Sequence, residues 1–282
     1  MIVATPTKTY TDSDLGGGFL FRAAADGEAA IVVPALGGDF STGVMSTAAL
    51  DARDEEALSG WLRRWNVSPL WGTRACNQVH GVRVLHVDDT PAPARPDADG
   101  MWTSTPAVAM VLKAADCAPV WVFARTARRL ALVHAGWRGV AGGIVEAAID
   151  AVAVENPLDA VALENPLAPG DAAIEAADIT VAVGPHLQAC CFEVGPEVAQ
   201  HFSDIEDAVL PAARITAARK RSDSVALSLS AAITAACKRR GITAEAVSIS
   251  SACTRCHPEM FHSYRRNGTG GPLMAAVGLV NA

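Results

Sequence analysis

The chain has 282 residues, enough for one large domain or two small ones, and half of its residues are hydrophobic. Only 19% are charged, and the formal net charge of -7 disfavours a surface for nucleic acid or for an anionic membrane. Any anion site must therefore be local. The opening residues, MIVATPTKTYTDSDLGGG, have no signal-peptide pattern, and no apolar run reaches the roughly 18 residues of a membrane helix. We therefore expect a cytoplasmic protein whose seven cysteines are thiols, ligands or core residues.

Apolar runs and helical periodicity predict the elements in chain order. In the first half we expect a strand at 31–33, a helix at about 51–65, and strands at 82–87, 107–112, 119–124 and 130–134. In the second half we expect a helix at about 140–155, a strand at 179–183, helices at 196–202 and 225–240, and strands at 247–250 and 273–280. Asp223 or Ser224 is the expected cap of the helix at 225–240, and Gly241 its expected end.

Strands outnumber helices and several follow one another directly, so the sequence predicts an α+β fold rather than a doubly wound parallel sheet. The proline-rich segment DTPAPARPDADG at 89–100 predicts a polar loop. The tetrapeptide ENPL occurs at 155–158 and again at 164–167, which we interpret as a surface insertion near 155–176. No linker divides the chain, and we expect a single domain over 1–282.

Three ligand-type residues lie where the strand pattern breaks, namely His80 in NQVHG, Cys117 in AADCAPV and His134 in VHAGWRG. Two imidazoles and a thiolate suit zinc, and three protein ligands leave a fourth position for water or substrate, as in catalytic zinc sites. The spacings of 37 and 17 residues fit no zinc-finger template. The residues alone leave two interpretations open, a metal site or two core histidines beside a buried cysteine.

Five motifs occur in order between about residue 40 and the C-terminus: NQVHG, ADCAPV, HAGWRG, GPHLQACCFEVG and the tail CT…MFHSYRRNGTGG. Together they resemble the YfiH-type purine nucleoside phosphorylase family, also known as multicopper polyphenol oxidoreductase or laccase-domain proteins. The resemblance implies a single-domain α/β/β/α arrangement with mixed sheets, similar to cysteine-type toxin deamidases. It also implies that His80, Cys117 and His134 hold a catalytic zinc ion.

The function implied by the resemblance is phosphorolysis of purine nucleosides such as inosine, adenosine or methylthioadenosine, with adenosine deaminase activity as a second reaction. The partners are then a purine nucleoside and phosphate, without nucleic acid or membrane, and the oligomeric state stays open. Between the strand and helix at 133–143, Gly136 and Gly139 keep the backbone open to an anion, and Arg138 is the natural cationic partner. Trp137 either stacks on a purine or fills the core.

The sequence departs from the family pattern at three positions. Gly43 and Gly271 stand where the family resemblance leads us to expect arginines, and Ala114 replaces a threonine before the ADC motif. Two lost arginines weaken the case for phosphate binding. Two further hypotheses about the function stay open. The second is copper-dependent oxidation of phenols, and the third is a degenerate zinc-binding protein without catalytic activity. Multicopper oxidases need closely spaced H-x-H pairs, whereas the seven histidines here are scattered.

The other cysteines, and the charged residues near the motifs, are given no catalytic role. Residues 253–257, CTRCH, match the C-x-x-C-H pattern of covalent haem attachment, but that chemistry needs export. We interpret Cys256 as an incidental neighbour of the family's CT motif, with a redox-sensitive dithiol as the alternative. Cys190 and Cys191 are interpreted as packing residues. Asp116 either orients a histidine ligand or caps a turn. Arg265 and Arg266 either reach an anion or form a surface pair.

Overall fold

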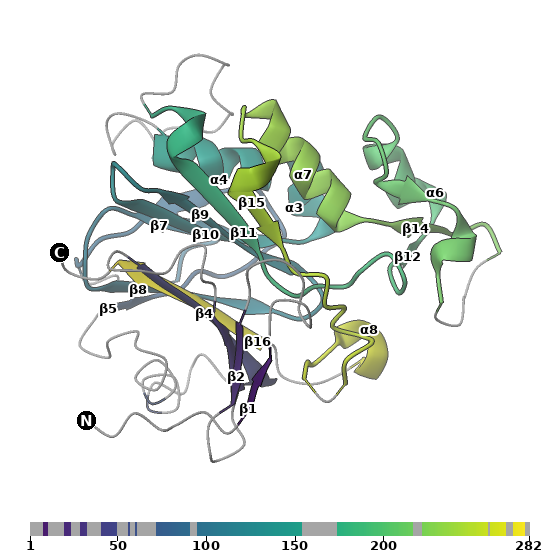
Figure 1. Ribbon diagram of the computed structural model, residues 1–282, viewed down its shortest axis with the longest axis horizontal. Helices are drawn as coiled ribbons and strands as arrows, with labels where there is room; N and C mark the ends of the chain where they lie inside the picture. Colours follow the sequence, from purple (N-terminus) through teal and green to yellow (C-terminus); the bar gives the residue numbers. More distant parts are fainter. Residues whose placement is uncertain are drawn as a thin grey trace.

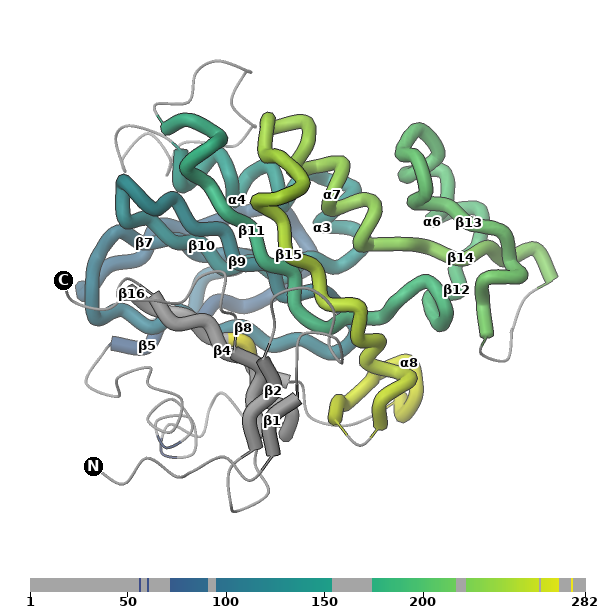
Figure 2. Tube along the Cα trace, viewed as in Figure 1, coloured from purple at the N-terminus to yellow at the C-terminus, as the bar shows by residue number. Residues whose placement is uncertain are grey.

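The structure is a computed structural model (Figure 1) that describes residues 72–90, 95–153, 174–216, 222–258 and 260–268. It also describes residues 56 and 60 and the backbone of five strands, β1 (Lys8–Tyr10), β2 (Leu20–Ala23), β3 (Ala29–Val32), β4 (Ser41–Ala49) and β16 (Leu273–Leu279). Figure 2 follows the same path as a tube. The expected helix at about 51–65 and the expected insertion near 155–176 lie almost wholly outside the described residues.

Two large mixed sheets form the body of the fold. The six-stranded sheet has the order β15-β11-β9-β10-β7-β6, with β6 Val84–His86, β7 Gly100–Thr103, β9 Ala118–Ala124, β10 Arg129–Ala135, β11 Ile179–Val183 and β15 Val247–Ile249. The seven-stranded sheet has the order β1-β2-β3-β4-β16-β8-β5, with β5 Gly72–Arg74 and β8 Val108–Ala114. Most neighbours are antiparallel, whereas β6 pairs parallel to β7, β11 to β15 and β5 to β8.

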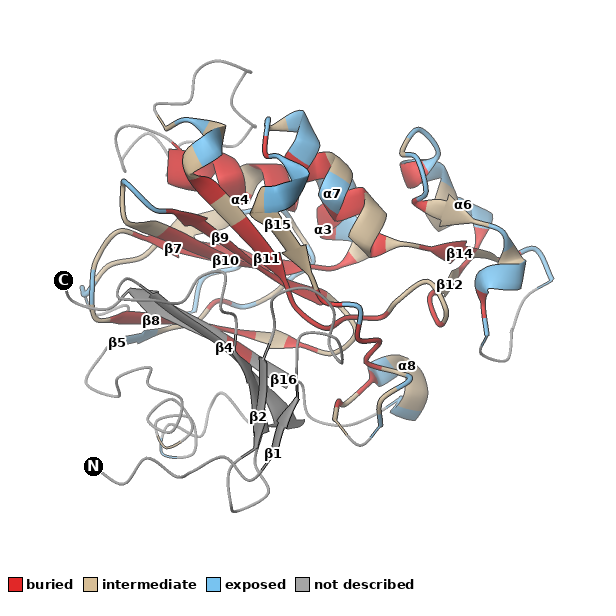
Figure 3. Ribbon diagram, in the orientation of Figure 1, coloured by how far each residue is buried: buried red, intermediate tan, exposed pale blue. Residues whose placement is uncertain are grey.

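Strands β9 and β10 divide their side chains between two hydrophobic cores. Successive strand residues point to opposite faces. Val120 and Val122 therefore pack into the core under the helices, while Trp121 and Phe123 pack into the core that also contains Met110 of β8. The continuous apolar run APVWVFA follows from this burial on both faces. Figure 3 shows the buried central strands and the exposed outer surfaces of the helices.

Helices α3 (Trp137–Gly142), α4 (Ile144–Ala153) and α7 (Leu229–Arg239) lie over the six-stranded sheet, on the side away from the seven-stranded sheet (Figure 1). The single helix expected at about 140–155 was wrong. Gly143 adopts a left-handed conformation, with φ 98°, and divides the segment into two helices. The helical pattern also begins earlier than expected, directly after Gly136, so Trp137 and Arg138 belong to the first helical turn.

The helix expected at 225–240 was also wrong in its first part. Val225–Leu227 forms β14, the central strand of a small sheet between β12 (Glu193–Val194) and β13 (Val209–Leu210). Helix α7 begins after Ser228, whose side chain accepts a hydrogen bond from the Ala231 backbone N–H. The cap is therefore Ser228, and the β-branched Val225 belongs to a strand, as its type favours.

The helical segment expected at 196–202 is confirmed, whereas the sequence predicted none of the other short helices and 3₁₀ turns. The helical segment at 196–202 is α6 (Pro196–Ala199) followed by a 3₁₀ turn, and α8 (Tyr264–Asn267) is a further short helix. Other 3₁₀ turns occupy Ala176–Asp178, Ala212–Arg214 and Ala244–Ala246. The α+β class with mixed sheets is confirmed. None of the helices in the described residues is long and apolar enough to cross a membrane.

Candidate metal centre

The structure brings His80, Cys117 and His134 together. Their ligand atoms lie within 4.8 Å of one another, and the two imidazole rings are 4.9 Å apart between centroids. The register of β9 against β10 explains why residues distant in sequence meet: Pro119 pairs with His134, so Cys117, directly before β9, lies beside the end of β10. His80 enters from the loop between β5 and β6.

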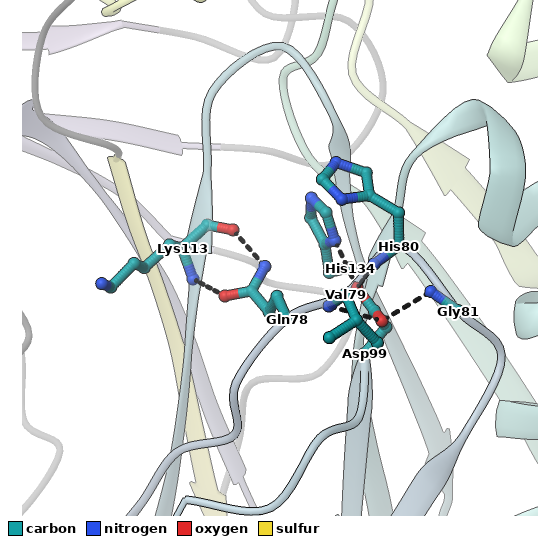
Figure 4. Close-up of polar contacts among 7 residues, drawn as sticks. All are labelled: Gln78, Val79, His80, Gly81, Asp99, Lys113 and His134. Carbon is teal, nitrogen blue, oxygen red and sulfur yellow. Dashed lines mark hydrogen bonds and ion pairs between the residues drawn. The ribbon is translucent and has the colours of Figure 1, made fainter.

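Asp99 organises both histidines (Figure 4). One of its carboxylate oxygens accepts hydrogen bonds from His134 Nδ1, at 2.9 Å, and from the backbone N–H of His80, also at 2.9 Å. The other oxygen accepts from the backbone N–H groups of Val79 and Gly81, at 3.0 and 2.7 Å. Because Nδ1 of His134 donates to the carboxylate, Nε2 is left as the metal-ligating atom. Sequence analysis missed Asp99, which lies in the segment interpreted as a polar loop.

The loop that carries His80 is held in an unusual conformation. His80 has φ 61°, in the left-handed region that residues with a Cβ rarely adopt. Besides Asp99, Gln78 fixes this loop, because its amide accepts from the Lys113 N–H and donates to the Lys113 carbonyl, both at 2.8 Å. The amide of Gln78 thereby pairs with the backbone of β8 much as a neighbouring strand would (Figure 4). Such contacts are what keep a strained ligand loop in place.

The electrostatics of the three residues favour a thiolate between imidazoles. Burial alone would raise the pKa of the Cys117 thiol, but hydrogen bonds and positive charge from His134 and His80 lower it to about 7. Burial would lower the pKa of His134, but its hydrogen bonds to Asp99 and Cys117 raise it to about 9. Asp99 has a lowered pKa, because the hydrogen bond from His134 and those from the backbone outweigh its burial. Without a metal, His134 therefore holds its proton at neutral pH. Zinc requires deprotonated sulfur and neutral imidazole nitrogen, so zinc binding at this centre would release that proton.

The glycines after His134 lie next to the ligands. A Cβ at Gly136 would stand 3.0 Å from the Cys117 sulfur and 3.1 Å from His80 Cδ2, so glycine gives these ligands the room they need. A Cβ at Gly139 would stand 3.1 Å from the Gly81 carbonyl oxygen, and Gly139 is buried. Trp137 and Arg138, by contrast, line the cleft described next.

A cleft of about 580 Å³ opens over the three ligands. Its basic side chains are Arg95, Lys113, Arg138 and Arg265. Its aromatic side chains are Trp137, Phe192 and Tyr264. Among the described residues that line it, Asp116 is the one carboxylate. In a chain of net charge -7, these four basic side chains concentrate positive charge at one place, which is where the composition allows an anion site.

The cleft is closed on one side by the C-terminal segment. Asp116 orients no histidine here; its two oxygens accept from the Thr254 hydroxyl and from the Arg265 N–H, both at 2.6 Å. Arg265 donates to the Glu193 carbonyl at 3.0 Å and faces the cleft. Arg266 is bound to backbone carbonyls, including those of Thr254 and Arg255, and is therefore structural.

Two of the three departures from the family pattern have defined positions. Gly43 lies in β4, opposite Val277 of β16. Ala114 is the buried last residue of β8. Gly271 lies outside the described residues.

Comparisons with known proteins bear on this arrangement. Residues 55–280 match the family described as multi-copper polyphenol oxidoreductase laccase. The chain belongs to this family. The matched range includes His80, Cys117 and His134 and the arginine and tyrosine side chains of the cleft.

Several similar proteins carry the name purine nucleoside phosphorylase. One from Pseudomonas aeruginosa is 33% identical over 233 residues, covering 80% of each chain. Another, YlmD from Geobacillus stearothermophilus, is 29% identical over 226 residues, covering 77% of this chain and 76% of the relative. The crystal structure of YlmD superposes with a TM-score of 0.67 at 26% identity, covering 94% of this chain and 97% of the other. A Bacillus licheniformis protein named YfiH has the same fold, with a TM-score of 0.67 at 21% identity.

Proposed function

We propose that this chain is a zinc-dependent purine nucleoside phosphorylase that acts on nucleosides such as inosine, adenosine or methylthioadenosine. The observation that carries the proposal is the convergence of a His/Cys/His ligand set with basic and aromatic side chains in one cleft of about 580 Å³. Such a cleft offers places for an anion, a flat base and a metal at once. The relatives named purine nucleoside phosphorylase support the same class of reaction.

The donor set suits zinc. Two imidazole nitrogens and one thiolate are characteristic zinc donors, and the cleft leaves room for a further ligand. When bound, the ion supplies Lewis acidity to the reacting groups. Copper also binds such donors. However, the chain has no H-x-H pair for a multicopper cluster, and histidine occurs in one of the two potential metal-binding groups of the described residues.

Different side chains of the cleft bind the phosphate and the purine base. Phosphate binds at Arg138, whose guanidinium carbon lies 4.3 Å from the centre of the Trp137 ring, a stacking that fixes the direction of the charge. Gly136 and Gly139 let this turn pass close to the ligands. Trp137 and the exposed Tyr264 offer faces for a purine. Phosphate then attacks C1′ of the ribose as the base departs, through an oxocarbenium-like state.

Deamination of adenosine is proposed as a slower second activity, because a zinc site with an open position is also what nucleobase deaminases use. Those enzymes move the proton with a glutamate. Among the described residues that line this cleft there is no glutamate, and both oxygens of Asp116 accept hydrogen bonds from the C-terminal segment. The chain's own residues therefore favour phosphorolysis over deamination.

The experiment that tests the function is phosphate-dependent release of hypoxanthine from inosine by zinc-loaded protein. We expect release that requires both phosphate and the metal, with ribose 1-phosphate as the second product. Oxidation of a phenol by copper-loaded protein without any phosphorolysis would instead favour the laccase hypothesis. Absence of both activities, at high phosphate, would favour a binding protein.

Replacing Arg138 with alanine is expected to raise the KM for phosphate roughly tenfold or more, because a charge-assisted contact of about 1.5–3 kcal/mol is lost. The KM for inosine should change much less. Arg138→Lys keeps the positive charge but loses the two-pronged guanidinium group, so its KM for phosphate should lie between those of the wild type and Arg138→Ala. Arg214→Ala, an exposed arginine away from the cleft, is the matched control. Equal changes in both KM values would show that Arg138 binds the nucleoside or supports the fold.

A further inference from the structure

A second group of ligand-type side chains lies outside the His80–Cys117–His134 centre. Cys190 and Cys191 follow strand β11, and Cys253 and Cys256 follow strand β15. Strands β11 and β15 are parallel neighbours, so their carboxyl ends meet at the same edge of the sheet. The four sulfur atoms lie within 4.8 Å of one another.

The distances within this four-cysteine cluster suit a tetrahedral metal. The sulfur of Cys256 lies 3.7 Å from that of Cys190 and 3.4 Å from that of Cys191, and the latter two are 3.8 Å apart. Metal–sulfur bonds of about 2.3 Å in a tetrahedron give sulfur–sulfur edges of about 3.8 Å. We propose that Cys190, Cys191, Cys253 and Cys256 bind a structural zinc ion, distinct from the ion at His80, Cys117 and His134.

A closed set of four thiolates is the usual composition of a structural zinc site, because no position is left for a substrate. Disulfide pairing would join sulfur atoms at about 2.0 Å and would use two of the cysteines at a time, whereas here three sulfurs are mutually near one another. Cys191 and Cys253 are buried, while Cys256 is exposed and gives the ion a route from solvent.

Backbone hydrogen bonds hold the two loops in position. The Thr254 N–H donates to the His186 carbonyl at 3.1 Å, which joins the loops through their backbones. Within each loop a turn presents the sulfurs, because the Cys256 N–H donates to the Cys253 carbonyl and the Cys191 N–H to the Gln188 carbonyl. A preformed site of this kind keeps the entropic cost of binding low.

Positive charge accompanies the sulfurs. Arg255 points a guanidinium nitrogen at the Cys191 sulfur, at 3.8 Å. Arg266 donates to the carbonyls of Thr254 and Arg255 and so braces the turn between Cys253 and Cys256. Four thiolates around a divalent ion carry a net negative charge, which these guanidinium groups offset.

The zinc ion fixes the C-terminal side of the cleft. Thr254, between the two cysteines of the second loop, donates to Asp116, which also accepts from the Arg265 N–H. Asp116 directly precedes Cys117 in the chain. The four-cysteine site thus acts as a clamp that holds Arg265 and the Asp116 turn against each other at the edge of the active cleft.

Metal analysis tests the proposal. Protein purified with a thiol reductant and without chelators is expected to contain about two zinc ions per chain, and about one in Cys117→Ser or in Cys256→Ser. X-ray absorption of the Cys117→Ser protein should show about four sulfur ligands at about 2.3 Å. Cys237→Ala removes a buried cysteine of α7 that belongs to neither group and is the matched control, with an unchanged zinc content.

Wild-type protein decides the question even if Cys256→Ser does not fold, because two sites give an average of about 2.5 sulfur ligands per zinc and the His/Cys/His site alone gives about one. Wild-type protein that holds only one zinc ion, all of which Cys256→Ser keeps, overturns the proposal, as does a disulfide among the four cysteines without zinc, or iron in place of zinc. A single ion lost in Cys256→Ser but kept in Cys117→Ser supports it and contradicts the zinc centre of the proposed function.

Discussion

Replacing Cys117 with serine is expected to remove the zinc ion from the His80–Cys117–His134 centre and to lower kcat/KM for inosine phosphorolysis by roughly a hundredfold or more. A bound metal supplies several kcal/mol of stabilisation to developing charge, and about 1.4 kcal/mol corresponds to a factor of ten. The neighbouring imidazoles lower the pKa of the Cys117 thiol to about 7, so sulfur binds as a thiolate. A serine hydroxyl stays protonated and is a poor zinc donor.

The measurement combines zinc content with steady-state kinetics on the same preparation. Cys237→Ala is again the control, since burial raises the pKa of its thiol to about 12 and it lies in α7. Zinc content at this centre that is equal in wild type and Cys117→Ser would remove Cys117 from the ligand set. Loss of zinc with full activity would show that the metal supports the fold rather than the reaction.

Sequence motifs were sufficient to single out the three candidate ligands, because each is a ligand-type residue at a break in the strand pattern. His80 lies in the loop between β5 and β6, Cys117 directly precedes β9, and His134 is the last residue but one of β10. The β9–β10 register then brings Cys117 beside His134 without further information. The loop of His80 is different. Its position depends on hydrogen bonds between the side chains of Gln78 and Asp99 and backbone groups, and such bonds leave no trace in a pattern of side-chain types.

The four-cysteine cluster, by contrast, could not be predicted from the sequence. Both halves, CC and CTRC, are visible in the sequence, but they are more than 60 residues apart. Their meeting depends on the parallel pairing of β11 with β15, and the sequence offers no sign that these two strands are neighbours. The two wrong helix predictions have local causes. Gly143 ends α3 and Ser228 begins α7, and hydrophobic periodicity alone does not reveal either boundary.

Replacing Asp99 with asparagine is expected to weaken zinc binding by roughly ten- to a hundredfold, because the residue that orients a histidine ligand is altered. The carboxylate accepts from His134 and from three consecutive backbone N–H groups. An amide has one oxygen for these donors, and its NH₂ group faces an N–H. Leaving buried donors without an acceptor costs about 1–3 kcal/mol each, so we also expect a loss of stability on the order of 3 kcal/mol.

Two readouts separate positioning of the ligands from general support of the fold. Zinc affinity, measured by competition with a chelator at a temperature where the variant is fully folded, reports on positioning, and denaturant unfolding reports on support. Asp97→Asn is the matched control: Asp97 is two residues earlier and accepts from the exposed Asn77 side chain at 2.6 Å. It should leave the affinity unchanged. If Asp99→Asn lowers stability while the folded protein binds zinc as tightly as wild type, then Asp99 only anchors the loop, and His134 is oriented by the packing around β10.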